Sequence, residues 1–208
     1  MLGLYARKIG MTQIFDDAGN QFPVTVIRIE PNVVLAVKSE KADGYSAVVV
    51  GIEDAKKNRV TKPHAGQFPE NIPLKKKIRE LRDFEKEVAI GDSLGISMFD
   101  GVRYVDVSGV SKGKGFQGVV KRYGFGGGRK THGSKFHREP GSTGMNTYPA
   151  RTFKNRKLPG RMGREKVTVL SLRVIKIDAE KQLIMVKGAV PGINKGLVFV
   201  RSAVKKGS

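Results

Sequence analysis

A glycine pattern of the kind that binds phosphate lies near the middle of the 208-residue chain. Gly113, Gly115 and Gly118 are spaced as G-x-G-x-x-G, and Val120 extends the pattern to that of kinase glycine loops. A dinucleotide site also needs a following helix and a parallel strand that ends in an acid about 20 residues later. Glu139 stands at that distance, but it lies in a glycine-rich tract with no strand before it.

The kinase alternative lacks its other parts. A kinase needs a strand lysine, a catalytic-loop aspartate and a metal-binding Asp-Phe-Gly motif. None of these is present, and His137-Arg-Glu139 resembles the catalytic loop only superficially. We interpret the glycines as positions where backbone N–H groups and the side chains of Lys112 and Lys114 approach phosphates closely.

Metal and nucleophilic chemistry find little support. The chain has no cysteine, and its histidines are His64, His132 and His137. Two histidines in the glycine-rich tract rarely complete a tetrahedral metal shell, and no Ser/His/Asp or paired-carboxylate arrangement can be assembled. We therefore expect no enzyme, no cofactor, no metal and no small-molecule substrate. The two histidines of the tract suit stacking on, or hydrogen bonding to, RNA.

The net charge of +20, from 39 Lys and Arg against 19 Asp and Glu, predicts a polyanionic partner. Residues 111–166 hold 15 of these cations, two acids and 12 of the 26 glycines. A membrane partner would call for a basic amphipathic helix or a lipid anchor, and neither is found. A secretory signal and a run of about 20 apolar residues are missing as well. We expect a cytoplasmic protein that binds nucleic acid and no membrane.

The basic segment is too poor in apolar residues to form a core. Between Lys121 and Lys166 the only Ile, Leu or Val is Leu158. Ordering the backbone costs about 1–2 kcal/mol per residue, so we expect this segment to be ordered by a partner or disordered when free. A solvated linker is the alternative. Linkers seldom carry aromatic residues among their cations, as this segment does at Tyr123, Phe125, Phe136, Tyr148 and Phe153.

The cations and histidines of this segment are the predicted RNA contacts. Arginines fork onto phosphates or stack on bases, whereas lysines act as point charges. The predicted set is Lys112, Lys114, Lys121, Arg122, Arg129, Lys130, His132, Lys135, His137, Arg138, Arg151, Lys154, Arg156, Lys157, Arg161 and Arg164.

The flanking sequence predicts β structure. Short β-branched runs bounded by Gly, Pro, Asn or Asp indicate strands at residues 11–15, 23–29, 33–38, 47–52, 102–107, 167–177, 183–187 and 197–200. Residues 17–20 and 178–181 are typical of hairpin connections. Seven or eight such strands favour an antiparallel barrel or sandwich. Because strands lie on both sides of it, the basic segment is an insertion whose two ends leave and rejoin the barrel close together, as a projecting finger.

This organisation predicts one globular domain from residues 1–110 and 167–208, with residues 111–166 inserted into it. Two local assignments rest on spacing alone. Ile78, Leu81, Phe84 and Val88 are spaced as on an amphipathic helix over residues 75–88. Residues 116–123 indicate a second helix, with Gly124 as its stop.

Several ordered motifs resemble the bacterial large-subunit ribosomal protein L-three family. The opening, residues 3–15 (GLYARKIGMTQIF), is similar to that of the family. The insertion resembles it at residues 111–118 (SKGKGFQG), 121–125 (KRYGF), 131–134 (THGS), 137–144 (HREPGSTG) and 159–163 (PGRMG). Residues 187–192 (KGAVPG) resemble its C-terminal strand and turn. The resemblance covers essentially the whole chain.

The resemblance implies a mainly β fold, an antiparallel six-stranded barrel of the translation-protein type, with a long irregular basic extension. It implies a structural protein that binds 23S-type rRNA directly, nucleates early assembly of the large subunit and touches ribosomal proteins L-fourteen and L-nineteen. It also implies a strand, not a helix, at residues 76–82. A free nucleic-acid-binding or RNA-chaperone module is the alternative function.

By the same resemblance the extension reaches toward the peptidyl transferase centre, with Gly144, Met145, Asn146, Thr147 and Tyr148 at its tip. Many family members carry a methylated glutamine in this stretch. The present sequence has no glutamine there, so that modification is not expected.

Overall fold

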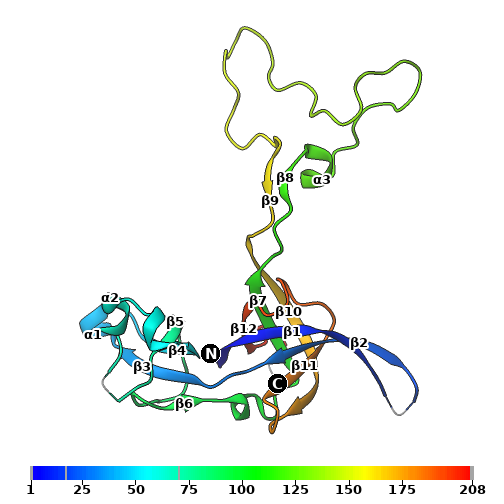
Figure 1. Cartoon of the computed structure of the whole chain (residues 1–208). Coiled ribbons are helices and arrows are strands. Elements are labelled where there is room, and N and C mark those ends of the chain that lie inside the picture. Colours follow the sequence, from blue (N-terminus) through cyan, green and yellow to red (C-terminus); the bar gives the residue numbers. More distant parts are fainter. Residues whose placement is uncertain (1, 17, 70, 207–208) are drawn as a thin grey trace. The chain divides into compact units, whose positions relative to one another are not determined.

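The computed structural model describes residues 2–16, 18–69 and 71–206 (Figure 1). The chain divides into two compact units. One combines Met1–Val110 with Lys166–Ser208, and we call it the globular unit. The other is Ser111–Glu165, which we call the insertion.

Six strands of the globular unit close into an antiparallel barrel, in the order β1-β12-β7-β10-β11-β2. This confirms the expected six-stranded barrel and excludes the sandwich. The strands are β1 (Gly3–Phe15), β2 (Gln21–Arg28), β7 (Tyr104–Val110), β10 (Lys166–Asp178), β11 (Leu183–Lys187) and β12 (Leu197–Ser202).

Two pairings set the connectivity of the barrel. Strand β1 pairs with β12, so the first and last strands of the chain close the barrel together. Strand β7 pairs with β10, and Val110 lies opposite Lys166 across that pair. The insertion is therefore bonded to two residues that are neighbours in the sheet.

Both expected hairpins form. The β10–β11 hairpin turns through residues 179–182, where the N–H of Lys181 donates to Oδ1 of Asp178 at 3.0 Å. The β1–β2 hairpin ends with Phe15 opposite Gln21. The N–H of Asn20 donates to Oδ1 of Asp16 at 2.7 Å in its turn. The remaining turn position, residue 17, lies outside the described residues.

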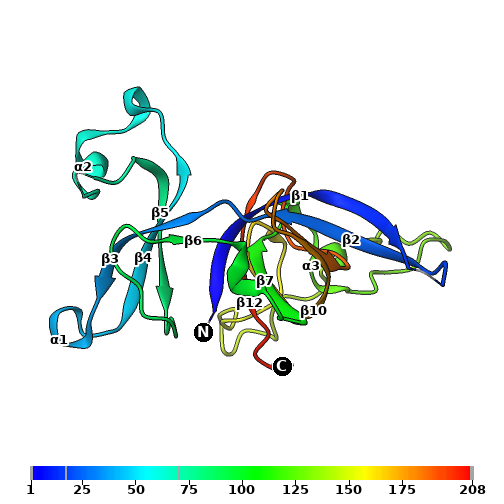
Figure 2. The ribbon, with the colours of Figure 1, turned by 90° about the horizontal axis from the view of Figure 1, so that it is seen from below.

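A second sheet stands beside the barrel in the globular unit, in the order β5-β4-β3-β6 (Figure 2). Its strands are β3 (Asn32–Lys38), β4 (Ala47–Asp54), β5 (Lys75–Arg82) and β6 (Ser93–Leu94). The strand pattern alone did not separate β3 and β4 from the barrel. The short helices α1 (Glu40–Asp43), η1 (Lys57–Arg59) and α2 (Lys62–Ala65) lie in the connections of this sheet.

The helix expected from spacing over residues 75–88 is wrong, and the strand implied by the resemblance is correct. Strand β5 pairs with β4 in regular register, with Val50 opposite Arg79 and Val48 opposite Leu81. Leu81 is buried, whereas its neighbour Arg82 is exposed. Pairing with β4 therefore decides this segment, because a single face of apolar residues at 78 and 81 also fits a short helix.

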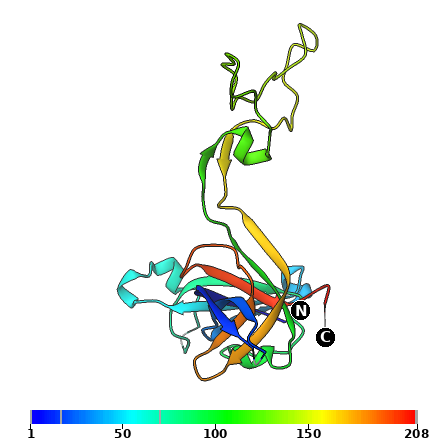
Figure 3. The ribbon, with the colours of Figure 1, turned by 90° about the vertical axis from the view of Figure 1, so that its right-hand side faces the viewer.

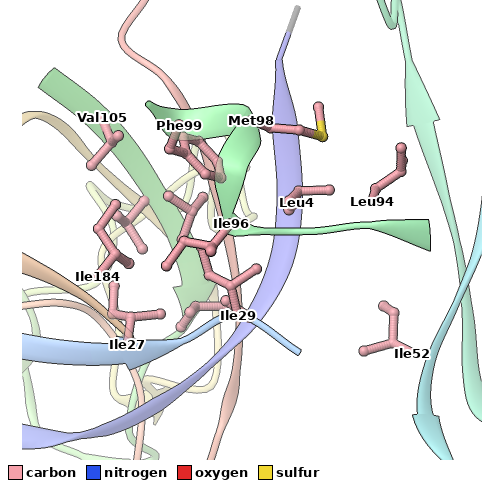
Figure 4. Close-up of a cluster of buried hydrophobic side chains, with 14 of the residues drawn as sticks. Leu4, Ile27, Ile29, Ile52, Leu94, Ile96, Met98, Phe99, Val105 and Ile184 are labelled. Carbon is pink, nitrogen blue, oxygen red and sulfur yellow. The ribbon is translucent and has the colours of Figure 1, made fainter. Parts of the chain in front are cut away.

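One hydrophobic core joins the barrel to the second sheet. Leu4, Ile27 and Ile184 belong to the barrel, while Ile52 and Leu94 come from the second sheet, and all are in one buried cluster (Figure 4). The 3-10 helix η2 (Ile96–Phe99) contributes three buried side chains to it: Ile96, Met98 and Phe99. Because both sheets contribute side chains to this core, it holds the barrel and the second sheet together.

The insertion has little regular structure. Strands β8 (Gly115–Gln117) and β9 (Gly160–Met162) pair antiparallel, and α3 (Val119–Tyr123) follows β8 (Figure 3). Gly124 ends α3 in the left-handed conformation, at φ 74°, which favours glycine. The expected helix over residues 116–123 is thus shortened at its start, because Phe116 belongs to β8. Val119 is the one buried residue of 111–165, all of which the structure describes.

Candidate nucleic-acid interface

The predicted RNA-binding side chains of the insertion are open to solvent. Of the sixteen, only Arg122 is partly buried, and the others are exposed. Within the described residues no cation of the insertion forms an ion pair. The globular unit differs, because there Arg7 pairs with Glu53 at 2.8 Å and Lys75 with Asp54 at 2.6 Å. The positive charge of the insertion is therefore uncompensated by the chain itself, which favours a polyanionic partner.

The base of the insertion is a two-stranded ribbon that gathers four predicted contacts: Lys112, Lys114, Arg161 and Arg164. The N–H of Ser111 donates to the carbonyl of Glu165 at 2.9 Å. The backbone of Gly163, at φ 76°, passes close to the backbone of Gly113 in the opposite segment of the insertion. A Cβ added to Gly163 would lie 3.1 Å from Cα of Gly113. A side chain at position 163 would push the two segments apart, so their close approach requires glycine there.

Phe116 is a candidate contact that the predicted set omitted. It lies opposite Arg161 in the β8–β9 ribbon, and its side chain is 76% exposed. An exposed ring beside a guanidinium is suited to stacking on a base. The sequence pattern assigned Phe116 to an expected helix over residues 116–123, whereas the structure places it on strand β8.

Arg122 has a structural role beside its predicted one. Its Nη1 donates to the carbonyl of Leu158 at 2.8 Å, which links α3 to the segment just before strand β9. The guanidinium carbon lies 5.0 Å from the centroid of the Tyr123 ring, and Nζ of Lys157 lies 5.9 Å from the same centroid. The structure thus brings Arg122 and Lys157 together around one aromatic ring.

Residues 128–138 form a loop that holds a second group of cations. The N–H of Gly128 donates to the carbonyl of His137 at 3.1 Å, and Nδ1 of His137 lies 3.0 Å from the carbonyl of Arg129. These contacts close the loop, and its exposed cations are Arg129, Lys130, Lys135 and Arg138. His132 is also exposed and has the left-handed φ of 59° at the turn. His137 therefore shapes the loop, while the cations around it stay accessible.

The stretch 144–148 is the most exposed apolar part of the insertion. Met145 is 83% exposed and Tyr148 is 90% exposed. The hydroxyl of Ser142 donates to the carbonyl of Gly144 at 2.8 Å. The carbonyl of Ser142 accepts a hydrogen bond from Nη2 of Arg156, which ties the outgoing chain to the returning one.

Arg151 and Lys154 lie on the returning chain between these anchors. Both side chains are exposed, and the guanidinium carbon of Arg151 lies 5.5 Å from the centroid of the Phe153 ring. Lys121, in the last turn of α3, is exposed as well. The predicted contacts thus fall into separate groups along the insertion rather than into one pocket, an arrangement typical of a surface that follows a nucleic-acid backbone.

Neither a metal-binding cluster nor a membrane-spanning helix is found in the described part of the chain. No three side chains of His, Asp or Glu come together there as they would around a metal ion. Every helix described is too short or too polar to span a bilayer.

Comparison with known proteins assigns the family. The profile of the family described as Ribosomal protein L3 matches residues 74–182, which is more than half of the chain. The chain belongs to the ribosomal protein L3 family. The match to the family profile includes the whole insertion.

Similarity to individual family members extends over the full chain. A protein of Treponema denticola named Large ribosomal subunit protein uL3 is 56% identical over 206 residues, 99% of each chain. A protein of the same name from Borrelia hermsii is 47% identical over 209 residues, the whole of both chains. Both alignments span the globular unit and the insertion alike.

Proposed function

We propose that this chain binds large-subunit (23S-type) rRNA directly through the insertion, and that it helps to nucleate early assembly of the large subunit. Membership of the ribosomal protein L3 family makes the chain a structural, non-enzymatic constituent of the large ribosomal subunit. Bacterial ribosomes are cytoplasmic, so the protein belongs to that compartment.

One observation carries the proposal. The insertion has a single buried side chain, Val119, and exposes its cations without ion pairs. Fixing such a chain in one conformation requires interactions from outside it. Phosphates supply them, because each neutralised phosphate releases counterions and so favours binding.

The arrangement of aromatic rings beside cations supports RNA as the partner. Arg122 and Lys157 lie around Tyr123, and Arg151 lies by Phe153. Unpaired bases stack on such rings, whereas the neighbouring cations meet the phosphates. Recognition is then mainly of RNA shape, and we propose that the insertion takes its bound conformation on rRNA.

The stretch Gly144, Met145, Asn146, Thr147 and Tyr148 is our candidate for the part that reaches toward the peptidyl transferase centre. Its exposure supports the idea, since apolar side chains such as Met145 and Tyr148 gain most from burial against RNA or protein. The barrel surface is proposed to contact ribosomal proteins L-fourteen and L-nineteen. Crosslinking within isolated large subunits tests both placements.

The assembly role is tested by replacing Arg151, Lys154 and Arg156 with Ala in a chain that is the cell's sole copy. We expect fewer complete large subunits and an accumulation of lighter precursors in sedimentation profiles. A normal profile with normal growth would argue against the role of these cations. If the protein instead bound random RNA duplex tightly and left the subunits on purification, the free RNA-binding module would be the better description.

A further inference from the structure

A cleft of about 680 Å³ lies within the globular unit and is lined by residues of that unit. It runs between strand β5, at the edge of the second sheet, and barrel strands β1, β7, β10 and β12. Lys77, Arg79 and Arg82 line it from β5, while Lys166 and Arg201 line it from the barrel. The volume is in the range of about 300–1,000 Å³ that is usual for ligand sites.

The cations of the cleft exceed the charge that the chain offers in return. Lys77 pairs with Glu53 at 3.4 Å, and Arg201 pairs with Asp106 at 3.3 Å. Three further cations form no ion pair within the described residues: Arg79, Arg82 and Lys166. Positive charge therefore faces the cleft from both walls.

Among the described residues that line the cleft, Glu80 is the one acid, and its charge is compensated by residues outside the cleft. Nζ of Lys38 lies 2.9 Å from its carboxylate, and the hydroxyl of Tyr45 donates to it at 3.1 Å. The hydrogen bond from Lys38 is the largest cause that lowers the pKa of Glu80. Glu80 is thus ionised but already paired, so it opposes an incoming anion only weakly.

Two aromatic rings lie between the cationic walls. The centroids of Tyr5 and Phe199 are 4.9 Å apart, with the rings tilted by 44°. The Phe199 ring rests against β1, where a Cβ at Gly3 would come 2.6 Å from its Cζ. Burial raises the pKa of the Tyr5 hydroxyl, so this ring stays uncharged at neutral pH. The cleft therefore combines an uncharged aromatic surface with flanking cations, as single-strand binding sites do.

The two walls of the cleft are held in place. The buried side chain of Asn32 accepts from the N–H of Tyr5 at 3.2 Å and donates to the carbonyl of Tyr5 at 2.9 Å. Glu53 on β4 pairs with Arg7 of the barrel at 2.8 Å and with Lys77 of β5. These contacts join the barrel to the second sheet, so the cleft exists before any ligand binds and needs little reorganisation.

We propose that this cleft binds a short single-stranded segment of RNA. Its phosphates lie between Arg79 and Lys166, and one base stacks on the surface made by Tyr5 and Phe199. The inference rests on the proposed function in taking RNA as the partner, and it adds a second contact in the globular unit. The cleft is also continuous in sequence with the insertion, since Lys166 is bonded to its last residue.

An acidic peptide is the competing occupant, because β5 is an edge strand that could accept another strand. A peptide strand would use the backbone of β5 and would leave the Tyr5–Phe199 surface without a role. RNA uses both the rings and the cations on the two walls, which is why we favour it.

The test is photo-crosslinking of the full chain to a uridine tetranucleotide, with the crosslinked peptides identified by mass spectrometry. We expect crosslinks at Tyr5 and Phe199. In the double variant Arg79→Ala, Lys166→Ala their yield should fall roughly 5- to 25-fold at about 0.1 M salt, as expected for two lost phosphate contacts. The matched control is Lys181→Ala, Lys205→Ala, which removes the same charge from exposed positions outside the cleft.

The outcomes separate this inference from the proposed function. Crosslinks at Tyr5 and Phe199 that the double variant loses and the control keeps support the cleft. Crosslinks confined to residues 111–165, with rRNA binding intact, overturn the cleft and leave the proposed function standing. If the unaltered chain binds no RNA at all, both the cleft and the proposed function are overturned. In isolated large subunits, crosslinks from Lys77 to a neighbouring protein in place of RNA would show that a protein strand fills the cleft.

Discussion

The loop of residues 128–138 gives a quantitative test of how the insertion binds RNA. Replacing Arg129, Lys130 and Lys135 with Ala removes three exposed cations that form no ion pair within the described residues. The net charge falls by three, from +20 to +17. Because none of the three side chains packs in a core, the fold should be unaffected.

The expected effect follows from counterion release. If the chain contacts roughly eight to ten phosphates, log Kd against log salt concentration has a slope of magnitude about 6 to 9. Each lost contact reduces that magnitude by about 0.7 to 0.9, so the triple variant should be shallower by about 2 to 3. The ratio of the affinity of the unaltered chain to that of the triple variant should therefore fall by roughly 20- to 40-fold when the salt concentration rises from 50 to 200 mM.

The assay is a filter-binding or fluorescence titration with a large-subunit rRNA fragment at several salt concentrations. The matched control replaces Lys56, Lys57 and Lys62, three exposed cations of the globular unit, and also lowers the charge to +17, three below +20. We expect the control to keep most of the slope. If the two triple variants lost the same slope, net charge rather than contact by this loop would govern binding, and the reasoning would be refuted.

Two further predictions concern the globular unit. Phe99→Ala should lower the free energy of unfolding by about 3–5 kcal/mol in chemical denaturation, because the ring is fully buried; the exposed Phe116→Ala should change it by less than about 0.5 kcal/mol. Because its folded-state pKa is lowered, Glu80 stabilises the fold above its ordinary pKa of 4.5, and this contribution is lost as pH falls below that value. Lys38→Met should weaken that acid dependence, measured by circular dichroism, and an unchanged acid midpoint would contradict the assignment.

The strands of the barrel could be predicted because their residues carry the signal locally. In β11, the β-branched Ile184 and Val186 are buried and alternate with the half-buried Leu183 and Met185. That alternation identifies a strand and its inward face. It does not identify the partner strand, so the separate sheet formed by β3, β4, β5 and β6 was not foreseen.

The candidate site shows a similar division. Charge counts identify the insertion, because cations without nearby acids are visible in the sequence. The carbonyl contact of Arg122, the position of Phe116 on a strand and the cleft beside β5 depend on chain segments far apart in sequence. Tyr5, Arg79, Lys166 and Phe199 lie in four different strands, and no local spacing links them.

The pairing of β1 with β12 has a consequence for biosynthesis. Three of the barrel strands, β10, β11 and β12, follow the insertion in the chain, so the ribosome making this protein releases the basic segment while half of the sheet is still missing. Closure then joins strands almost 200 residues apart, which is a slow kind of contact to form. Newly made chains thus pass through a stage in which the barrel sheet is incomplete and the basic insertion is unbound. Such a stage favours aggregation unless RNA or a chaperone binds the chain quickly.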